Sequence, residues 1–169
     1  SLAIGRLGHV LEKCSAAHAS VSKDTVTERV NRLAGLPSPP LVLSEFPVEM
    51  RLYKKSSGMD WHKDDQLFSA PQCEAVLTLS NTSDSVTEWI TADGEHNSAW
   101  TPPNSLLLVR AGVSGARHRV RPLQRGERTI LKLVFKPLGS EPLSAYWDHM
   151  DSPGFPGQRK QSRKKRGRR

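Results

Sequence analysis

The chain has 169 residues, of which 36% are hydrophobic, and this is enough for one domain with a buried core. It contains no apolar run long enough to span a bilayer, so the sequence predicts no membrane-spanning helix. The formal net charge of +8 is concentrated in residues 159–169, which hold eight of the 25 Lys and Arg and no acidic residue. The other 17 basic residues balance the 17 acidic ones, which argues against a nucleic-acid-binding body and favours a basic tail that serves as an address or tether.

Residues 1–40 predict a helical layer. Their strongest signal is SKDTVTERVNRLAG (22–35), in which Val and Leu recur at helical spacing. Ser22 or Asp24 can cap the start of this helix, and Gly35 marks its end. The apolar and small polar residues that precede it are also compatible with a helix, and the sequence LPSPP breaks the chain after it.

Residues 41–150 change to a strand pattern. Alternating or continuous apolar runs, separated by turn-forming residues, predict strands at 48–54, 73–80, 86–91, 105–111, 117–122 and 128–135. Many short strands with little helix between them predict a mainly β, sandwich- or barrel-like core, with the helical layer packed outside it. Residues 151–169 are rich in Pro and Gly and then basic, and we expect them to be disordered.

The polar sequence WHKDD (61–65) indicates a metal site. Side chains two apart on an extended strand point to the same face, so His62 and Asp64 can bind one ion together. Asp60 shares that face, and on spacing alone Asp60 and His62 form a rival pair. An H-x-D pattern is weak evidence by itself, so the hypothesis requires a third ligand.

Two histidines and one carboxylate form the facial ligand set of non-haem Fe(II) oxygenases, which leaves other coordination positions open. Of the remaining histidines, His118 alone starts an alternating segment inside the strand core. His9 and His18 lie in the predicted helical layer, His96 lies in a polar loop, and His149 lies near the tail. His118 is therefore the best candidate for the third ligand.

Arg128 is the candidate partner for a dicarboxylate cosubstrate. If one end of such a molecule chelates the iron, the other end needs a fixed cation, and a guanidinium binds a carboxylate through two parallel hydrogen bonds. Arg128 starts the next strand, ten residues after His118, and a turn through QRGE would bring that strand back beside the first. A solvated charge at a strand end is the alternative interpretation.

In order, these motifs resemble the 2-oxoglutarate and Fe(II)-dependent dioxygenases, and among them the prolyl 4-hydroxylase-like group. The resemblance runs from about Glu49 to Pro137. RLYKKSSGMDWHKD is similar to the strand of that group that ends in Tyr and is followed by a glycine and H-x-D. HRVRPLQRGERTILKLVF is similar to its distal segment, with a histidine, a glycine, and a Lys or Arg ten residues after the histidine.

The resemblance implies a double-stranded β-helix, a jelly-roll or cupin-like core. It implies that His62, Asp64 and His118 are iron ligands, that Arg128 binds the distal carboxylate of 2-oxoglutarate, and that Tyr53 hydrogen-bonds to this cosubstrate. It implies a hydroxylase that uses Fe(II), 2-oxoglutarate and O2, with ascorbate keeping the iron reduced and succinate and CO2 as coproducts. A protein or peptide side chain is the expected substrate.

The chain departs from the pattern of the group near the expected substrate entrance. Met59 stands where an aromatic residue is common, and Asn104 stands where glycine is usual before the buried strand. SVTEWITADGE replaces a Gly-Gly-x-Thr stretch. The resemblance therefore supports iron and cosubstrate binding more strongly than it supports a prolyl substrate.

Two other functions remain open. An AlkB-like nucleic-acid demethylase would fit the basic tail, but that group has an asparagine two residues after the arginine, where this chain has Ile130. A non-catalytic, metal-binding or sensing β-barrel is the other alternative, and the complete set of candidate residues argues against it. The basic tail favours a nuclear or cytoplasmic protein and is compatible with contact to nucleic acid or an import receptor.

Overall fold

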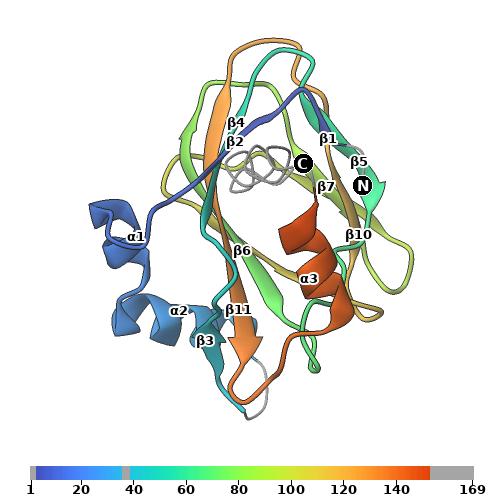
Figure 1. Cartoon of the computed structure of the whole chain (residues 1–169). Helices are drawn as coiled ribbons and strands as arrows, with labels where there is room; N and C mark the ends of the chain where they lie inside the picture. Colours follow the sequence, from blue (N-terminus) through green and yellow to red (C-terminus); the bar gives the residue numbers. More distant parts are fainter. Residues whose placement is uncertain (1–2, 36–38, 153–169) are drawn as a thin grey trace, which may run out of the picture.

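Two antiparallel β-sheets face each other in the computed structural model, which describes residues 3–35 and 39–152 (Figure 1). The five-stranded sheet has the order β1-β5-β10-β7-β8. Its strands are β1 (Ala3–Ile4), β5 (Gly58–His62), β10 (Arg117–Val120), β7 (Thr87–Ile90) and β8 (His96–Ala99). The six-stranded sheet has the order β2-β4-β11-β6-β9, and β3 also pairs with β11. Its strands are β2 (Leu7–Val10), β4 (Glu49–Tyr53), β11 (Arg128–Pro137), β6 (Cys73–Asn81), β9 (Leu106–Arg110) and β3 (Leu41–Leu43).

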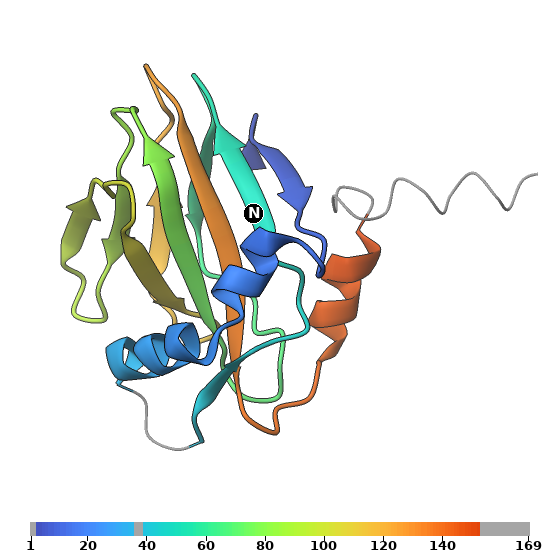
Figure 2. The ribbon, with the colours of Figure 1, turned by 90° about the vertical axis from the view of Figure 1, so that its left-hand side faces the viewer.

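The central strand β11 shows how sequence alternation builds the layers. Its odd-numbered apolar residues face outward, where they are covered by the helices α1 (Ala16–Val21) and α2 (Asp24–Ala34), which lie in front of this sheet in Figure 2. The buried outer cluster comprises Val21, Val30, Leu41, Val48, Cys73, Ala75, Leu131, Leu133 and Phe135. The even-numbered residues of β11 face the space between the sheets. The predicted mainly β fold with N-terminal helices is confirmed.

Helix α2 confirms the strongest helix signal of the sequence. Gly35 ends it with a left-handed φ of 57°, and its N–H donates to the carbonyl of Asn31. The predicted capping by Ser22 or Asp24 is wrong, because Lys23 is the N-cap residue and Asp24 is the first helical residue. An acidic side chain in the first turn still stabilises the helix through its dipole.

Helix α3 (Ser144–Asp151) was not predicted, and it closes one end of the space between the sheets. Its buried Tyr146 packs against Phe46, Phe68 and the inward-facing Val134. Within the described ranges, no helix is long and apolar enough to cross a membrane. Disorder was predicted for residues 151–169. The prediction is wrong for Asp151, which is the last residue of α3, and residues 153–169 lie outside the described residues.

The prediction of a helical layer is wrong for residues 3–10, because this segment contains the strands β1 and β2. β1 pairs with β5 of one sheet and β2 pairs with β4 of the other, so residues 3–10 form an N-terminal bridge between the sheets. The bridge turns at Gly5, which has a φ of 67° and whose carbonyl accepts a hydrogen bond of 2.9 Å from the Ser57 hydroxyl. Pairing with two open sheet edges outweighs the local preference of this segment.

Two tight turns place the strands that carry the candidate site. Gly126, in the connection from β10 to β11, has a φ of 69°, and a Cβ atom there would lie 2.3 Å from the carbonyl oxygen of Thr82. Asn104, before β9, has a φ of 63°. Asparagine tolerates this left-handed conformation better than most residues, which explains how it can stand where the resembling group uses glycine.

Candidate metal centre

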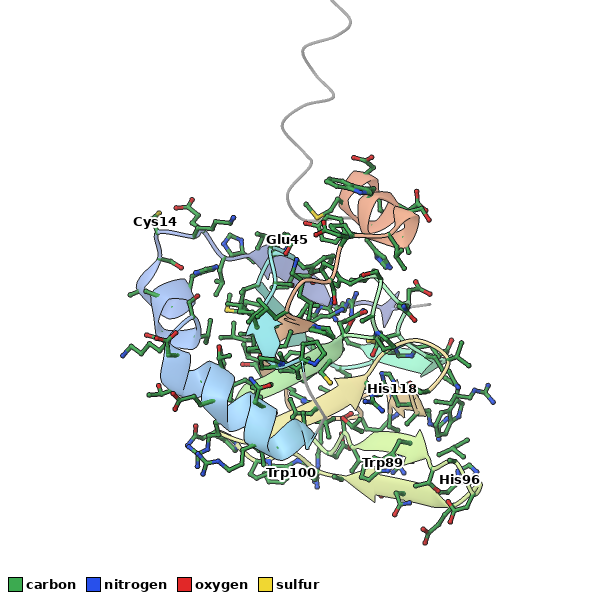
Figure 3. The ribbon with its side chains drawn as sticks, turned by 90° about the horizontal axis from the view of Figure 1, so that it is seen from below. Cys14, Glu45, Trp89, His96, Trp100 and His118 are labelled. Carbon is green, nitrogen blue, oxygen red and sulfur yellow. The ribbon has the colours of Figure 1, made fainter. Side chains whose placement is uncertain are left out.

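His62 and His118 lie opposite each other on the adjacent strands β5 and β10. The register between these strands shifts at Asp60 and Trp61, since His62 pairs with His118 while Met59 pairs with Val120. This bulge lets both Met59 and His62 line the space between the sheets. The two imidazole rings are 4.3 Å apart, centroid to centroid. Trp89 lies across from His118 on β7, and both are labelled in Figure 3.

Asp64 completes a group of three possible metal ligands. One carboxylate oxygen lies 3.7 Å from Nε2 of His62, and the other lies 3.5 Å from Nε2 of His118. The three ligand atoms all lie within 4.8 Å of one another. Asp64 follows the end of β5, and its carbonyl oxygen accepts a hydrogen bond of 2.9 Å from the N–H of Gly112. The rival pair built on Asp60 is not supported, because the described cluster contains Asp64 and the side chain of Asp60 is exposed.

The environment of the two histidines suits metal binding. Nδ1 of His62 lies 2.6 Å from the carbonyl oxygen of Asp60, and Nδ1 of His118 lies 3.0 Å from the carbonyl oxygen of Ala116. A carbonyl only accepts, so each Nδ1 carries the proton and each Nε2 keeps its lone pair. Nε2 of His62 is buried and has no hydrogen-bond partner among the described residues. Burial lowers the pKa of His62, which favours the neutral form that a metal requires.

Arg128 is a buried cation whose charge is not paired with any carboxylate in the part of the chain that the structure describes. It is 2% exposed, and its Nη1 donates to the Thr87 hydroxyl at 3.2 Å. Its Nε has no hydrogen-bond partner, and no carboxylate of the described residues forms an ion pair with it. Burial lowers its pKa. An uncompensated buried charge is costly, so this geometry suits an anionic ligand.

Arg128 and the three candidate metal ligands line the same inner cavity, which has a volume of about 50 Å³. Tyr53 lines it too; this residue is 1% exposed and is the β4 partner of Arg128 in the sheet register. The structure therefore brings together all five residues that sequence reasoning selected. It adds Thr87, and no sequence pattern connects the side chain of this residue with Arg128.

A larger cavity of about 430 Å³, here called the mouth cavity, adjoins the inner one and shares His62, Asp64 and Met59 with it. Two ion pairs form part of its wall. Arg51 lies 2.8 Å from Glu49, and Lys132 lies 2.6 Å from Glu74. Sequence reasoning missed these residues, although charges at the inward positions of EMRLY and RTILKLVF were a signal for them.

No protein-family model and no curated protein matches this sequence. Solved structures match the fold. A 2OG-Fe(II) oxygenase family oxidoreductase from Burkholderia pseudomallei has 15% identity and a TM-score of 0.62, with 75% of this chain and 57% of that chain covered. HygX from Streptomyces hygroscopicus, with nickel and 2-oxoglutarate bound, has 13% identity and a TM-score of 0.61, with 81% and 72% covered. A Trichoplax adhaerens prolyl hydroxylase, in complex with a hypoxia inducible factor peptide fragment, has 14% identity and a TM-score of 0.60, with 78% and 62% covered.

These matches place the chain in the fold of the 2OG-Fe(II) oxygenases, and the predicted double-stranded β-helix is confirmed. This chain spans less than two thirds of the Burkholderia and Trichoplax chains.

Proposed function

We propose that this protein is an Fe(II)- and 2-oxoglutarate-dependent dioxygenase that hydroxylates its substrate. The observation that carries the proposal is the pairing of two sites in one cavity. A group of two histidines and one aspartate lies beside a buried arginine that has no carboxylate partner among the described residues. A metal alone would explain the first site but not the second, whereas a metal-chelating dicarboxylate explains both.

In this proposal each residue has one task. His62, Asp64 and His118 hold the iron. The hydrogen bonds from the Nδ1 atoms of the two histidines fix the orientation of their imidazole rings. Arg128, held by Thr87, binds the distal carboxylate of 2-oxoglutarate, and Tyr53 hydrogen-bonds to the same molecule. All of these residues lie within 41–150, which we propose as the dioxygenase domain.

When bound, the iron would catalyse the oxidation by O2, in which one substrate C–H, one O2 and one 2-oxoglutarate give one C–OH, one succinate and one CO2. The chain's own part is to hold the cosubstrate in line and to keep water out. The apolar residues Val76, Leu107, Val109, Val120 and Ile130 line the inner cavity and serve that second task. Ascorbate is expected to keep the iron reduced between turnovers.

A protein side chain is the substrate that we favour. The Trichoplax neighbour was solved with a peptide, and in this chain the mouth cavity opens beside the proposed iron ligands. The basic residues of 159–169 give a further means of contact with a macromolecule.

The test is succinate formation by the purified protein with Fe(II), ascorbate, O2 and 2-oxoglutarate. We expect turnover in the wild type and its loss in His62→Ala and Arg128→Ala. Arg125→Ala is the matched control, since Arg125 is an exposed arginine in the same turn, and it should keep wild-type activity.

A wild type that forms no succinate is then titrated anaerobically with Fe(II) and 2-oxoglutarate. If the protein failed to bind Fe(II), or failed to bind 2-oxoglutarate, the proposal would be overturned. Binding of both without turnover, even when a panel of peptides is added, would identify a sensing module in place of an enzyme.

A further inference from the structure

The charges around the mouth cavity are not balanced once the proposed cofactors are in place. The charges of Fe(II), Asp64, 2-oxoglutarate and Arg128 cancel within the inner site. Arg51 and Lys132 are neutralised by their partners Glu49 and Glu74. Asp65, at the rim, is exposed and lies 3.1 Å from His149 of α3.

Two further cations line the mouth cavity, Arg6 and Lys63. Lys63 is exposed and donates to the carbonyl of Val113 at 2.8 Å. Arg6 is half-buried, and its Nη1 lies 3.2 Å from the sulfur of Met59. A thioether is a weak acceptor for a guanidinium that has five N–H donors. No carboxylate of the described residues forms an ion pair with Arg6.

The N-terminal bridge fixes Arg6 in position. Arg6 lies between β1 and β2, so pairing to both sheets restrains its backbone on either side. The hydrogen bond from Ser57 to Gly5 restrains the turn just before it. Its guanidinium contacts Met59, and Met59 also lines the inner cavity that contains His62 and Arg128. A group bound to Arg6 would thus lie in the same cavity as the proposed iron ligands.

We propose that Arg6 binds a carboxylate of the substrate, so that this enzyme acts on an acidic substrate. The inference rests on the proposed dioxygenase function and gives its substrate class. A carboxylate would accept the hydrogen bonds that a thioether cannot satisfy and would balance the remaining positive charge. The Glu49–Arg51 and Glu74–Lys132 pairs supply further donors and acceptors to the polar part of the same substrate.

The carboxylate has two possible sources, an acidic side chain in a peptide or a free amino acid. The experiment measures how strongly each of two sets of compounds stimulates succinate formation. One set is short peptides with a central Asp or Glu, and the other is free aspartate and glutamate. Each compound is compared with its Asn or Gln counterpart, and hydroxylated product is detected by mass spectrometry. The set that stimulates identifies the source.

We expect an acidic compound to stimulate turnover at least about tenfold better than its amide counterpart, as the loss of charge-assisted hydrogen bonds requires. Arg6→Gln should raise KM for that compound about 10- to 100-fold and abolish the preference for acid over amide. Arg6→Lys should restore part of the preference. Arg29→Gln, at an exposed arginine of α2, is the matched control and should retain it.

Equal stimulation by acid and amide would overturn the inference, and so would stimulation by no acidic compound of either set. A preference for acid over amide that survives Arg6→Gln would also overturn the inference. Thermal unfolding of each variant shows whether that variant is folded. Succinate formed by the wild type without added substrate separates the two proposals. If that basal turnover is present and the acid preference is absent, only the substrate class is wrong.

Discussion

At the scale of single residues, the candidate site is defined by buried polar atoms that have no partner within residues 3–35 and 39–152. Nε2 of His62 and Nε of Arg128 are both buried and both lack a hydrogen-bond partner among the described residues. Such atoms are rare in folded proteins because each costs about 1–3 kcal/mol. Their occurrence in one cavity indicates that a ligand, rather than the fold, provides their partners.

Replacement of Arg128 tests this interpretation at the distal end of the cavity. Arg128→Gln keeps a donor but removes the charge, so we expect KM for 2-oxoglutarate to rise about 10- to 100-fold, which corresponds to about 1.5–3 kcal/mol. Anaerobic titration with Mn(II) should show metal binding in the variant, because Arg128 is not a member of the ligand cluster. An unchanged KM would mean that the carboxylate binds elsewhere.

The lowered pKa of His62 makes a prediction about pH. Burial holds this pKa below its ordinary value of 6.5, so between the two values the unfolded chain binds a proton more readily than the folded one. The contribution of His62 to the free energy of unfolding is therefore complete above pH 6.5 and decreases as the pH falls toward the pKa of the folded state.

Urea unfolding of the metal-free protein at about pH 7.5 and about pH 5.5 measures this effect. On going from the higher to the lower pH, the wild type should lose more of its free energy of unfolding than the His62→Gln variant does. His9→Gln is the control, because His9 is exposed and should leave the wild-type difference intact. If His62→Gln showed the same difference in stability between the two pH values as the wild type, His62 would not be the group responsible.

At the scale of elements, the turn between β10 and β11 determines where Arg128 begins its strand. Gly126→Ala meets both a left-handed φ of 69° and a Cβ position 2.3 Å from a carbonyl oxygen, so the backbone must shift. Gly139→Ala is the matched comparison, with a φ of 83° and, apart from its chain neighbours, no described residue within 4 Å of the added Cβ. We expect a loss of about 1–2 kcal/mol for Gly139→Ala and of at least about 3 kcal/mol for Gly126→Ala, measured by urea unfolding. Equal losses would mean that the turn adapts without strain.

Strong alternation let the sequence predict the central strands β6 and β11, and the period and stop of α2 were equally readable. The short edge strands β1, β2 and β8 were missed because their pairing depends on partners distant in the chain or on a hairpin with few apolar residues. Helix α3 was missed because its packing, rather than its pattern, holds it in place.

The same limit applies to the candidate site. His62 and Asp64 are readable from their spacing, and His118 and Arg128 are readable from their places in strands. Thr87 and Arg6 are not, because only the sheet topology brings them to the cavities.

At the scale of the whole molecule, the proposed ligands connect the two sheets. The candidate metal ligands lie at β5 and β10 of the five-stranded sheet, whereas Arg128 and Tyr53 belong to the six-stranded sheet. A metal and a dicarboxylate bound together would therefore resist separation of the sheets. Because such ligands bind only the folded state, they stabilise it by mass action.

This stabilisation is measurable without catalysis. Ni(II) and 2-oxoglutarate at about 100 times their dissociation constants should each add about 2.7 kcal/mol, and each should raise Tm by roughly 5–10 °C. His118→Ala should remove the response to the metal, and Arg128→Gln should weaken only the response to 2-oxoglutarate. A Tm that does not respond in the wild type would contradict the proposed site.

The described chain passes the mouth cavity at both of its ends, since Arg6 and Ser152 both line it. A purification tag, fluorescent protein or immobilisation linker joined directly beside Arg6 or Ser152 would stand at the entrance. Assays on such fusions would report obstruction of the entrance together with catalysis. Activity screens are therefore best run on protein that carries no fusion at these two positions.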